Sequence, residues 1–140
     1  MTSWYRATFP TRLSSSRAPL QELVTTQGGF RLATSVGGVL TGRGADLIVI
    51  DDPLKPSDAM SESRRIAANE WFDGTLYSRL NDKNKGAIVI IMQRLHEDDL
   101  VGHVLRQEGW ESSAKNPGRS TIAGGLSATA YSDLQGFAAD

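Results

Sequence analysis

Two short runs of uninterrupted aliphatic residues, at 47–50 and 87–92, are the strongest hydrophobic signals along the chain. The first reads Leu-Ile-Val-Ile and the second Ala-Ile-Val-Ile-Ile-Met. Runs of this length, rich in β-branched residues, are typical of strands that are covered on both faces of an α/β sheet. We therefore predict two buried strands, the first of them central in its sheet.

The segments that follow each run show helical patterns. A long helix is predicted from the candidate N-caps Ser57 or Ser61, and a shorter one from the acidic turn at 96–99 to about residue 107. Their inward positions are Ala68, Phe72, Leu76 and Leu80 in the first helix, and Leu100, Val104 and Leu105 in the second. The order strand, helix, strand, helix is that of a right-handed parallel crossover unit. The predicted fold class is α/β, with a mostly parallel central sheet.

The two ends of the chain have other patterns. Residues 20–26 and 30–36 alternate apolar and polar positions around Gln27-Gly28-Gly29, which predicts an N-terminal hairpin whose short loop needs positive φ. After Trp110 the chain is rich in small residues and poor in large apolar ones. We therefore predict one domain over 1–111 and a poorly structured tail over 112–140.

Composition removes several classes of function. The 140 residues contain no cysteine, which excludes disulfides, thiolate zinc sites and a cysteine nucleophile. The formal net charge of −1 argues neither for nor against a nucleic-acid partner. No apolar run reaches the roughly 18 residues that a membrane span requires. A soluble intracellular protein is the expectation.

Asp51 and Asp52 follow directly after the first aliphatic run. In open α/β sheets, ligands bind beyond the carboxyl ends of the strands. A carboxylate pair at such an end suits ATP hydrolysis, in which one carboxylate holds Mg²⁺ and the other orients and deprotonates the attacking water. Asp52 precedes Pro53, so we expect it to be extended. The alternative is a strand that simply stops at a polar turn.

Further candidates lie at the second strand and in the glycine-rich connection. Gln93 ends the second run, where its amide would lie near a γ-phosphate if the strands are neighbours, and Arg94 suits phosphate binding. Arg43 lies in GGVLTGRG, which resembles a phosphate-binding loop but lacks its lysine and its hydroxyl residue. The HEDD turn at 96–99, with His103, fits a capped helix start better than a metal site.

Three stretches taken together resemble the large terminase subunit of tailed bacteriophages. They are GGFRLATSVGGVLTGRGADLIVIDDPLKPSDAMSESRR, NEWFDGTLYSRL and GAIVIIMQRLHEDDLVGHVL. The resemblance covers roughly residues 4–111. It implies a motor that uses ATP to package double-stranded DNA into a procapsid, and a P-loop (RecA-like, additional-strand) ATPase domain followed by a nuclease domain.

The resemblance also implies roles, partners and a location. It would make Asp51 the Mg²⁺-associated carboxylate, Asp52 the catalytic base and Gln93 the residue that senses the nucleotide. ATP and Mg²⁺ are the implied cofactors. The implied partners are double-stranded DNA, the portal protein, the small terminase subunit and further copies in a motor oligomer, with no membrane. The implied location is the cytoplasm of a bacterial host.

The sequence also departs from the family. The second acid is Asp where many members have Glu, and neither the phosphate-binding loop nor the nuclease domain is recognisable in these 140 residues. We therefore expect a central fragment of the ATPase domain, one that alone neither binds ATP tightly nor hydrolyses it. The alternatives are a fragment of another P-loop ATPase, such as a helicase, and a non-catalytic α/β domain.

Overall fold

The computed structural model describes residues 3–14, 21–38, 40, 42–116 and 119–124. The chain divides into two compact units, Met1–Ser35 and Val36–Asp140.

The first unit contains the predicted hairpin. Helix α1 (Ser3–Thr8) comes first, and strands β1 (Glu22–Val24) and β2 (Phe30–Leu32) then pair antiparallel. Gly28 in the connecting turn has a φ of +85°, a conformation that glycine adopts without steric cost. The prediction of a hairpin with positive φ in its loop is confirmed.

The second unit contains a mixed four-stranded sheet in the order β3-β4-β6-β5. Its strands are β3 (Leu47–Asp51), β4 (Ala87–Gln93), β5 (Trp110–Asn116) and β6 (Arg119–Gly124). β3 and β4 run parallel, with Leu47 opposite Ala87 and Asp51 opposite Ile91. β6 is antiparallel to both β4 and β5. The mixed α/β class is confirmed, but a mostly parallel sheet is wrong for the described strands, because two of their three pairings are antiparallel.

The prediction of a poorly structured tail is corrected for residues 112–116 and 119–124. The residues here are mostly small or polar, yet β5 and β6 pair antiparallel with each other. β6 also pairs with β4 from Ile88 to Gln93. Backbone hydrogen bonds to a neighbouring strand supply this order, and they need no large apolar side chain. The prediction for 125–140 lies outside the described residues.

The two aliphatic runs differ in their burial. β4 is a central strand, and Ile88, Ile90 and Met92 are at most 2% exposed. β3 lies at the edge of the described sheet, where Leu47 is 51% and Val49 is 55% exposed. Burial of the second run is confirmed on the face that carries Ile88, Ile90 and Met92. The prediction that the first run is a central strand covered on both faces is wrong for the described sheet.

The long predicted helix is divided. It consists of α2 (Pro56–Ala59) and α3 (Glu62–Trp71), followed by a π-helical turn (Phe72–Leu76) and a 3₁₀ turn (Tyr77–Arg79). Gly74 lies inside the π-helical turn, which fits its weak helical preference. The apolar stripe is nevertheless buried as predicted, since Ala68, Phe72, Leu76 and Leu80 all belong to the core. The stripe faces inward although the helix changes its winding.

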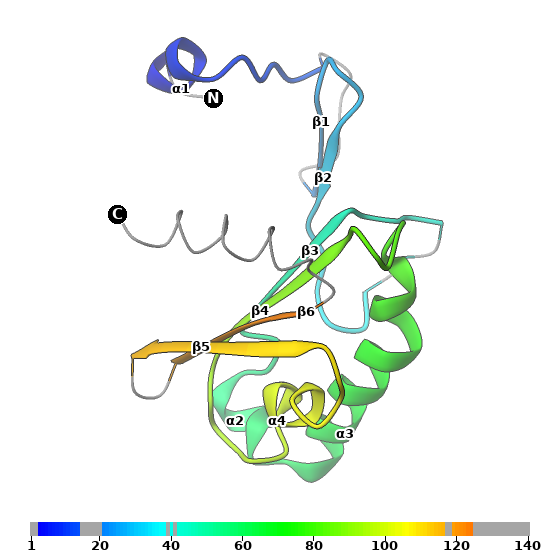
Figure 1. Cartoon of the computed structure of the whole chain (residues 1–140), viewed down its shortest axis with the longest axis vertical. Coiled ribbons are helices and arrows are strands. Elements are labelled where there is room, and N and C mark those ends of the chain that lie inside the picture. The colour runs from blue at the N-terminus through cyan, green and yellow to red at the C-terminus, as the bar shows by residue number, and fades with distance from the viewer. Residues whose placement is uncertain (1–2, 15–20, 39, 41, 117–118, 125–140) are drawn as a thin grey trace. The chain divides into compact units, whose positions relative to one another are not determined.

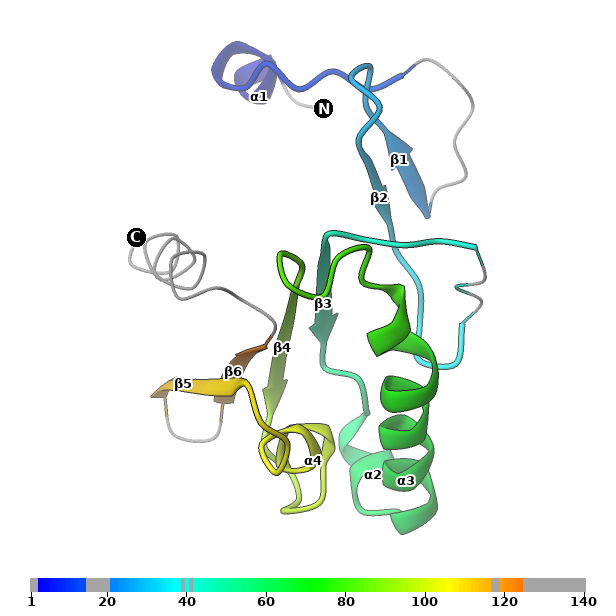
Figure 2. The ribbon, with the colours of Figure 1, turned by 45° about the vertical axis from the view of Figure 1, so that its right-hand side comes forward.

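The second predicted helix is shorter than expected. α4 spans Leu100–Val104 and begins after the HEDD turn, whose acids precede the helix. Leu100 and Val104 are fully buried, but Leu105 is 40% exposed, so its predicted inward position is wrong. Figures 1 and 2 show α4 near the carboxyl end of β4, and α2 near that of β3.

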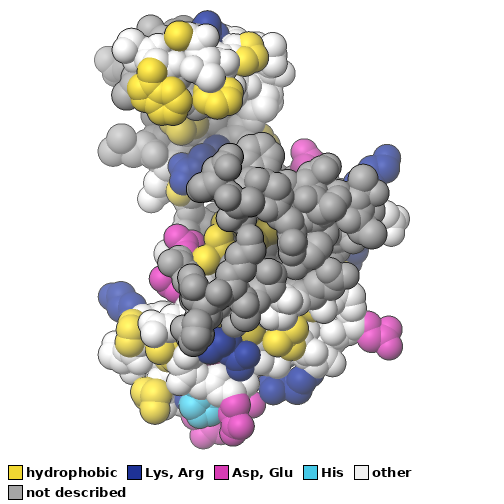
Figure 3. All heavy atoms as spheres, turned by 60° about the vertical axis from the view of Figure 1, so that its left-hand side comes forward, with side chains coloured by type: hydrophobic (Ala, Val, Ile, Leu, Met, Phe, Trp, Pro, Cys, Tyr) yellow, Lys and Arg dark blue, Asp and Glu magenta, His cyan; other side chains and the backbone are white. Residues whose placement is uncertain are grey.

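Among the described residues, no helix has the length and apolar character needed to cross a membrane. Basic and acidic side chains are interspersed over the described part of the face in Figure 3. This mixture agrees with the net charge of −1.

Candidate functional site

The two aspartates lie where the chain leaves the sheet. Asp51 is the last residue of β3, and Asp52 follows it with a φ of +42°. Few residues other than glycine adopt this left-handed region, although aspartate and asparagine do so most readily. The expected extended geometry of Asp52 is therefore wrong, and the chain turns sharply at the second carboxylate. Backbone conformations of this kind cluster at functional sites.

A hydrogen-bonded link joins Asp52 to the end of β4. The backbone N–H of Asp52 donates to the carbonyl oxygen of Ile91 at 2.9 Å. In a regular parallel ladder the Gln93 N–H would next donate to the backbone carbonyl oxygen of Asp52. Because the chain turns away, it donates instead to Oδ1 of the Asp52 side chain at 3.3 Å. The Asp52 carboxylate thus continues the ladder for one more bond.

The sheet therefore brings Asp51, Asp52 and Gln93 to one end, as the sequence predicts for the carboxyl ends of parallel neighbours. All three residues are exposed. Carboxylate oxygens of this kind are the ligands that Mg²⁺ prefers, and it commonly keeps several of its waters. One oxygen of Asp52 is held by the Gln93 amide, so the carboxylate has a defined orientation. The contact uses the Gln93 backbone, whereas the sequence argument rested on its side chain.

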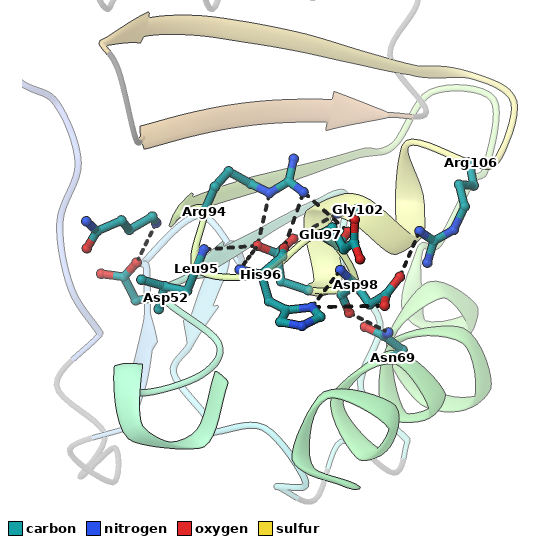
Figure 4. Close-up of polar contacts among 11 residues, drawn as sticks. Asp52, Asn69, Arg94, Leu95, His96, Glu97, Asp98, Gly102 and Arg106 are labelled. Atoms are coloured by element: carbon teal, nitrogen blue, oxygen red, sulfur yellow. Dashed lines mark hydrogen bonds and ion pairs between the residues drawn. The ribbon is translucent and has the colours of Figure 1, made fainter. Parts of the chain in front are cut away.

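Arg94 is directed elsewhere. Its Nε donates to Oδ2 of Asp99 at 2.9 Å, and its Nη2 reaches the carbonyl oxygens of His96 and Glu97, both at 3.4 Å. Figure 4 shows the Arg94 guanidinium lying over the turn that precedes α4. In the structure Arg94 pairs with the buried carboxylate of Asp99, while the sequence predicts a contact with phosphate.

The HEDD turn is a helix cap, as predicted. Asp99 is the N-cap of α4, and its Oδ1 accepts from the Gly102 N–H at 2.9 Å. A side chain at Gly102 would collide with the Glu97 carbonyl oxygen, so the turn requires glycine there. No group of three or more His, Asp or Glu side chains suited to a metal occurs in the part of the chain that is described.

Sequence reasoning missed the internal role of Asp99. Asp99 is completely buried, although an N-cap is usually solvated. An aspartate three residues before a glycine, at the start of an apolar run, is a recognisable cap signal. Nothing in that signal indicates that an arginine five residues earlier returns to the same carboxylate.

Arg43 lies at the other end of β3. Ala45 pairs with Leu80, just after the 3₁₀ turn, through backbone bonds to Arg79 and Asn81, which fixes the chain before β3 begins. Arg43 is two residues from Ala45, while Asp52 is seven residues beyond it, or roughly 23 Å along an extended strand. The structure does not bring Arg43 to the aspartates.

Comparisons of the chain with protein-family models, with curated proteins and with solved structures find no match. The residues that the fold assembles are Asp51, Asp52 and Gln93.

Proposed function

We propose that this chain carries the magnesium- and water-binding end of an ATP-hydrolysing site, in a DNA-packaging motor of the phage terminase type. One observation carries the proposal. Asp51 ends β3, which runs parallel to β4, and Asp52 follows it directly. The Asp52 carboxylate accepts from the backbone N–H of Gln93, the last residue of β4. Asp51 then holds Mg²⁺, and Asp52 orients and deprotonates the attacking water.

The local geometry supports this division of roles. Asp52 has one carboxylate oxygen bonded to a backbone amide, which fixes the side chain without neutralising its charge. A fixed carboxylate is better suited to orienting a water molecule than a freely rotating one. Asp51 is the last strand residue, whereas Asp52 has a positive φ and leaves the strand. The two carboxylates therefore need not serve the same ligand atom.

The order of motifs supports the finer proposal. A buried strand ending in Gln93 follows the Asp51-Asp52 strand through a helix, which is the arrangement expected of a P-loop ATPase core of the additional-strand type. We propose this fold for residues 36–111. ATP and Mg²⁺ are the proposed cofactors. Double-stranded DNA, the portal protein and the small terminase subunit are the proposed partners, and the bacterial cytoplasm is the proposed location.

The site as proposed needs a phosphate-binding loop from outside these 140 residues. A purified chain of these 140 residues is accordingly expected to show no magnesium-dependent ATP turnover. Measurable turnover would contradict the proposed division of the site. The DNA upstream of the coding sequence is the first test. An in-frame G-x-x-x-x-G-K-[ST] motif there, with a nuclease module downstream, supports a packaging motor, whereas helicase motifs favour the alternative ATPase.

The longer polypeptide encoded with such a loop provides the second test. Asp52→Ala is expected to lower its ATP turnover by about 10²–10⁴-fold, the usual contribution of a general base. Asp51→Ala is expected to raise the magnesium concentration required. Glu70→Ala is the control, because Glu70 is an exposed acid on α3. Undiminished turnover in both aspartate variants would favour a non-catalytic α/β domain.

A further inference from the structure

Asp99 is the most deeply buried charged side chain among the described residues, with no exposed surface. Its two oxygens accept from four donors. Oδ1 accepts from the Gly102 N–H, which is the ordinary N-cap bond. Oδ2 accepts from Arg94 Nε at 2.9 Å and from the N–H groups of Leu95 and His96 at 3.2 and 3.4 Å. The two oxygens therefore serve different parts of the chain.

The three donors to Oδ2 follow Gln93 without a gap. Arg94, Leu95 and His96 form the loop that leaves β4, and each of them is bonded to this one oxygen. Gln93 is the last residue before that loop, and its N–H makes the bond to Asp52. A loop held at three successive residues leaves the strand end little freedom to rotate.

We propose that Asp99 is a positioning residue for Gln93, and through Gln93 for the Asp52 carboxylate. Its relevance to catalysis rests on the function proposed above. Arg94 is a positioning residue in the same way. Its guanidinium bonds to Asp99 and so holds the loop that follows β4. This role replaces the phosphate contact that the sequence predicts for Arg94. Asp99 and Arg94 touch neither Asp51 nor Asp52 in any contact that the structure describes.

A purely structural role predicts something different. If Asp99 served only to cap α4, its Oδ1 would be sufficient. Loss of the bonds to Oδ2 would then leave the conformation of the loop unchanged. Asp99→Asn separates the two roles, because asparagine keeps an acceptor for Gly102 but presents an NH₂ group to the loop donors. Asparagine is also a good N-cap.

The test is amide hydrogen exchange on the ¹⁵N-labelled 140-residue chain without metal. In Asp99→Asn, the Gln93 amide is expected to lose its protection, while the amides of Ile88 and Ile90 within β4 keep theirs. Asp98→Asn is the matched control, since Asp98 lies in the same turn but is 55% exposed at its side chain. Unchanged Gln93 exchange, or faster exchange along all of β4, would overturn the proposal.

Arg94→Gln decides the matter if Asp99→Asn does not fold. It removes the guanidinium and leaves the acceptors for Leu95 and His96 in place, so selective loss of protection at Gln93 is again expected. Arg106→Gln is its control, because Arg106 pairs only with exposed Asp98 in the contacts described. Unaltered Gln93 exchange in Arg94→Gln would overturn the proposal. The hydrogen-exchange experiments contain no metal, so their result is independent of whether Asp51 and Asp52 bind Mg²⁺.

Discussion

The backbone N–H of Gln93 donates to the side-chain Oδ1 of Asp52 at 3.3 Å, where a parallel ladder would ordinarily use a backbone carbonyl as the acceptor. The bond exists because Asp52 has a positive φ and turns the chain out of the sheet. One carboxylate therefore ends the strand pairing and remains exposed. This relationship separates the effects of substitutions on the fold from their effects on the proposed metal binding.

Substitutions of Asp52 are expected to show that separation. Asp52→Asn should change the free energy of unfolding by no more than about 0.5 kcal/mol, because asparagine tolerates positive φ and keeps an oxygen for Gln93. Asp52→Val should cost about 1–3 kcal/mol, because a β-branched residue is strained at this φ and accepts no hydrogen bond. Urea unfolding followed by circular dichroism measures both. Equal stabilities for the two variants would contradict the positive φ.

Glycine positions in the two helical regions offer a second prediction. Gly102→Ala should destabilise the chain by about 1–3 kcal/mol, because its methyl group would collide with the Glu97 carbonyl. Gly74→Ala, for which no atom lies within 4 Å of the new methyl group, should stabilise it by about 0.5–1 kcal/mol. Thermal unfolding should rank the proteins Gly74→Ala, wild type, Gly102→Ala. A reversed order would show that the turn before α4 is not packed as described.

The edge strand β3 leads to a prediction about association. Its exposed Leu47 and Val49 lie on one face of a strand with a single neighbour in the described sheet, a combination that favours pairing with another chain. Val49→Lys should reduce self-association, and Ile50→Lys should unfold the chain because Ile50 is buried. Sedimentation velocity over a range of concentrations measures the first effect. Equal association of wild type and Val49→Lys would contradict it.

The sequence predicts β3, β4, the N-terminal hairpin and the position of the aspartate pair because these depend on local patterns, whereas it does not predict β5 and β6. Four aliphatic residues in succession define β3, and the strand's direction fixes where Asp51 lies. Burial of a strand residue depends instead on which face of the sheet is covered. Leu47 and Val49 look as apolar as Ile88 and Ile90 but lie on the opposite face, whereas Ile50, on the same face as Ile90, is buried although β3 has a single neighbour in the described sheet.

The parts of the site that sequence reasoning missed depend on contacts between neighbouring turns. Arg94 was expected at a phosphate because arginine follows a strand end, yet the carboxylate nearest to it is Asp99. The positive φ of Asp52 overrides the preference that Pro53 imposes on the residue before it. Neither feature has a period or a motif, so only the folded chain reveals it.

Binding of Mn²⁺, a paramagnetic substitute for Mg²⁺, tests the central claim most directly. On the ¹⁵N-labelled chain, Mn²⁺ should broaden the amide signals of Asp51, Asp52 and Gln93 first, and added Mg²⁺ should restore them. The broadening should be lost in the Asp51→Asn/Asp52→Asn double variant and kept in Glu70→Gln. Broadening that centres elsewhere, or that survives in the double variant, would contradict the account of this strand end as a metal site.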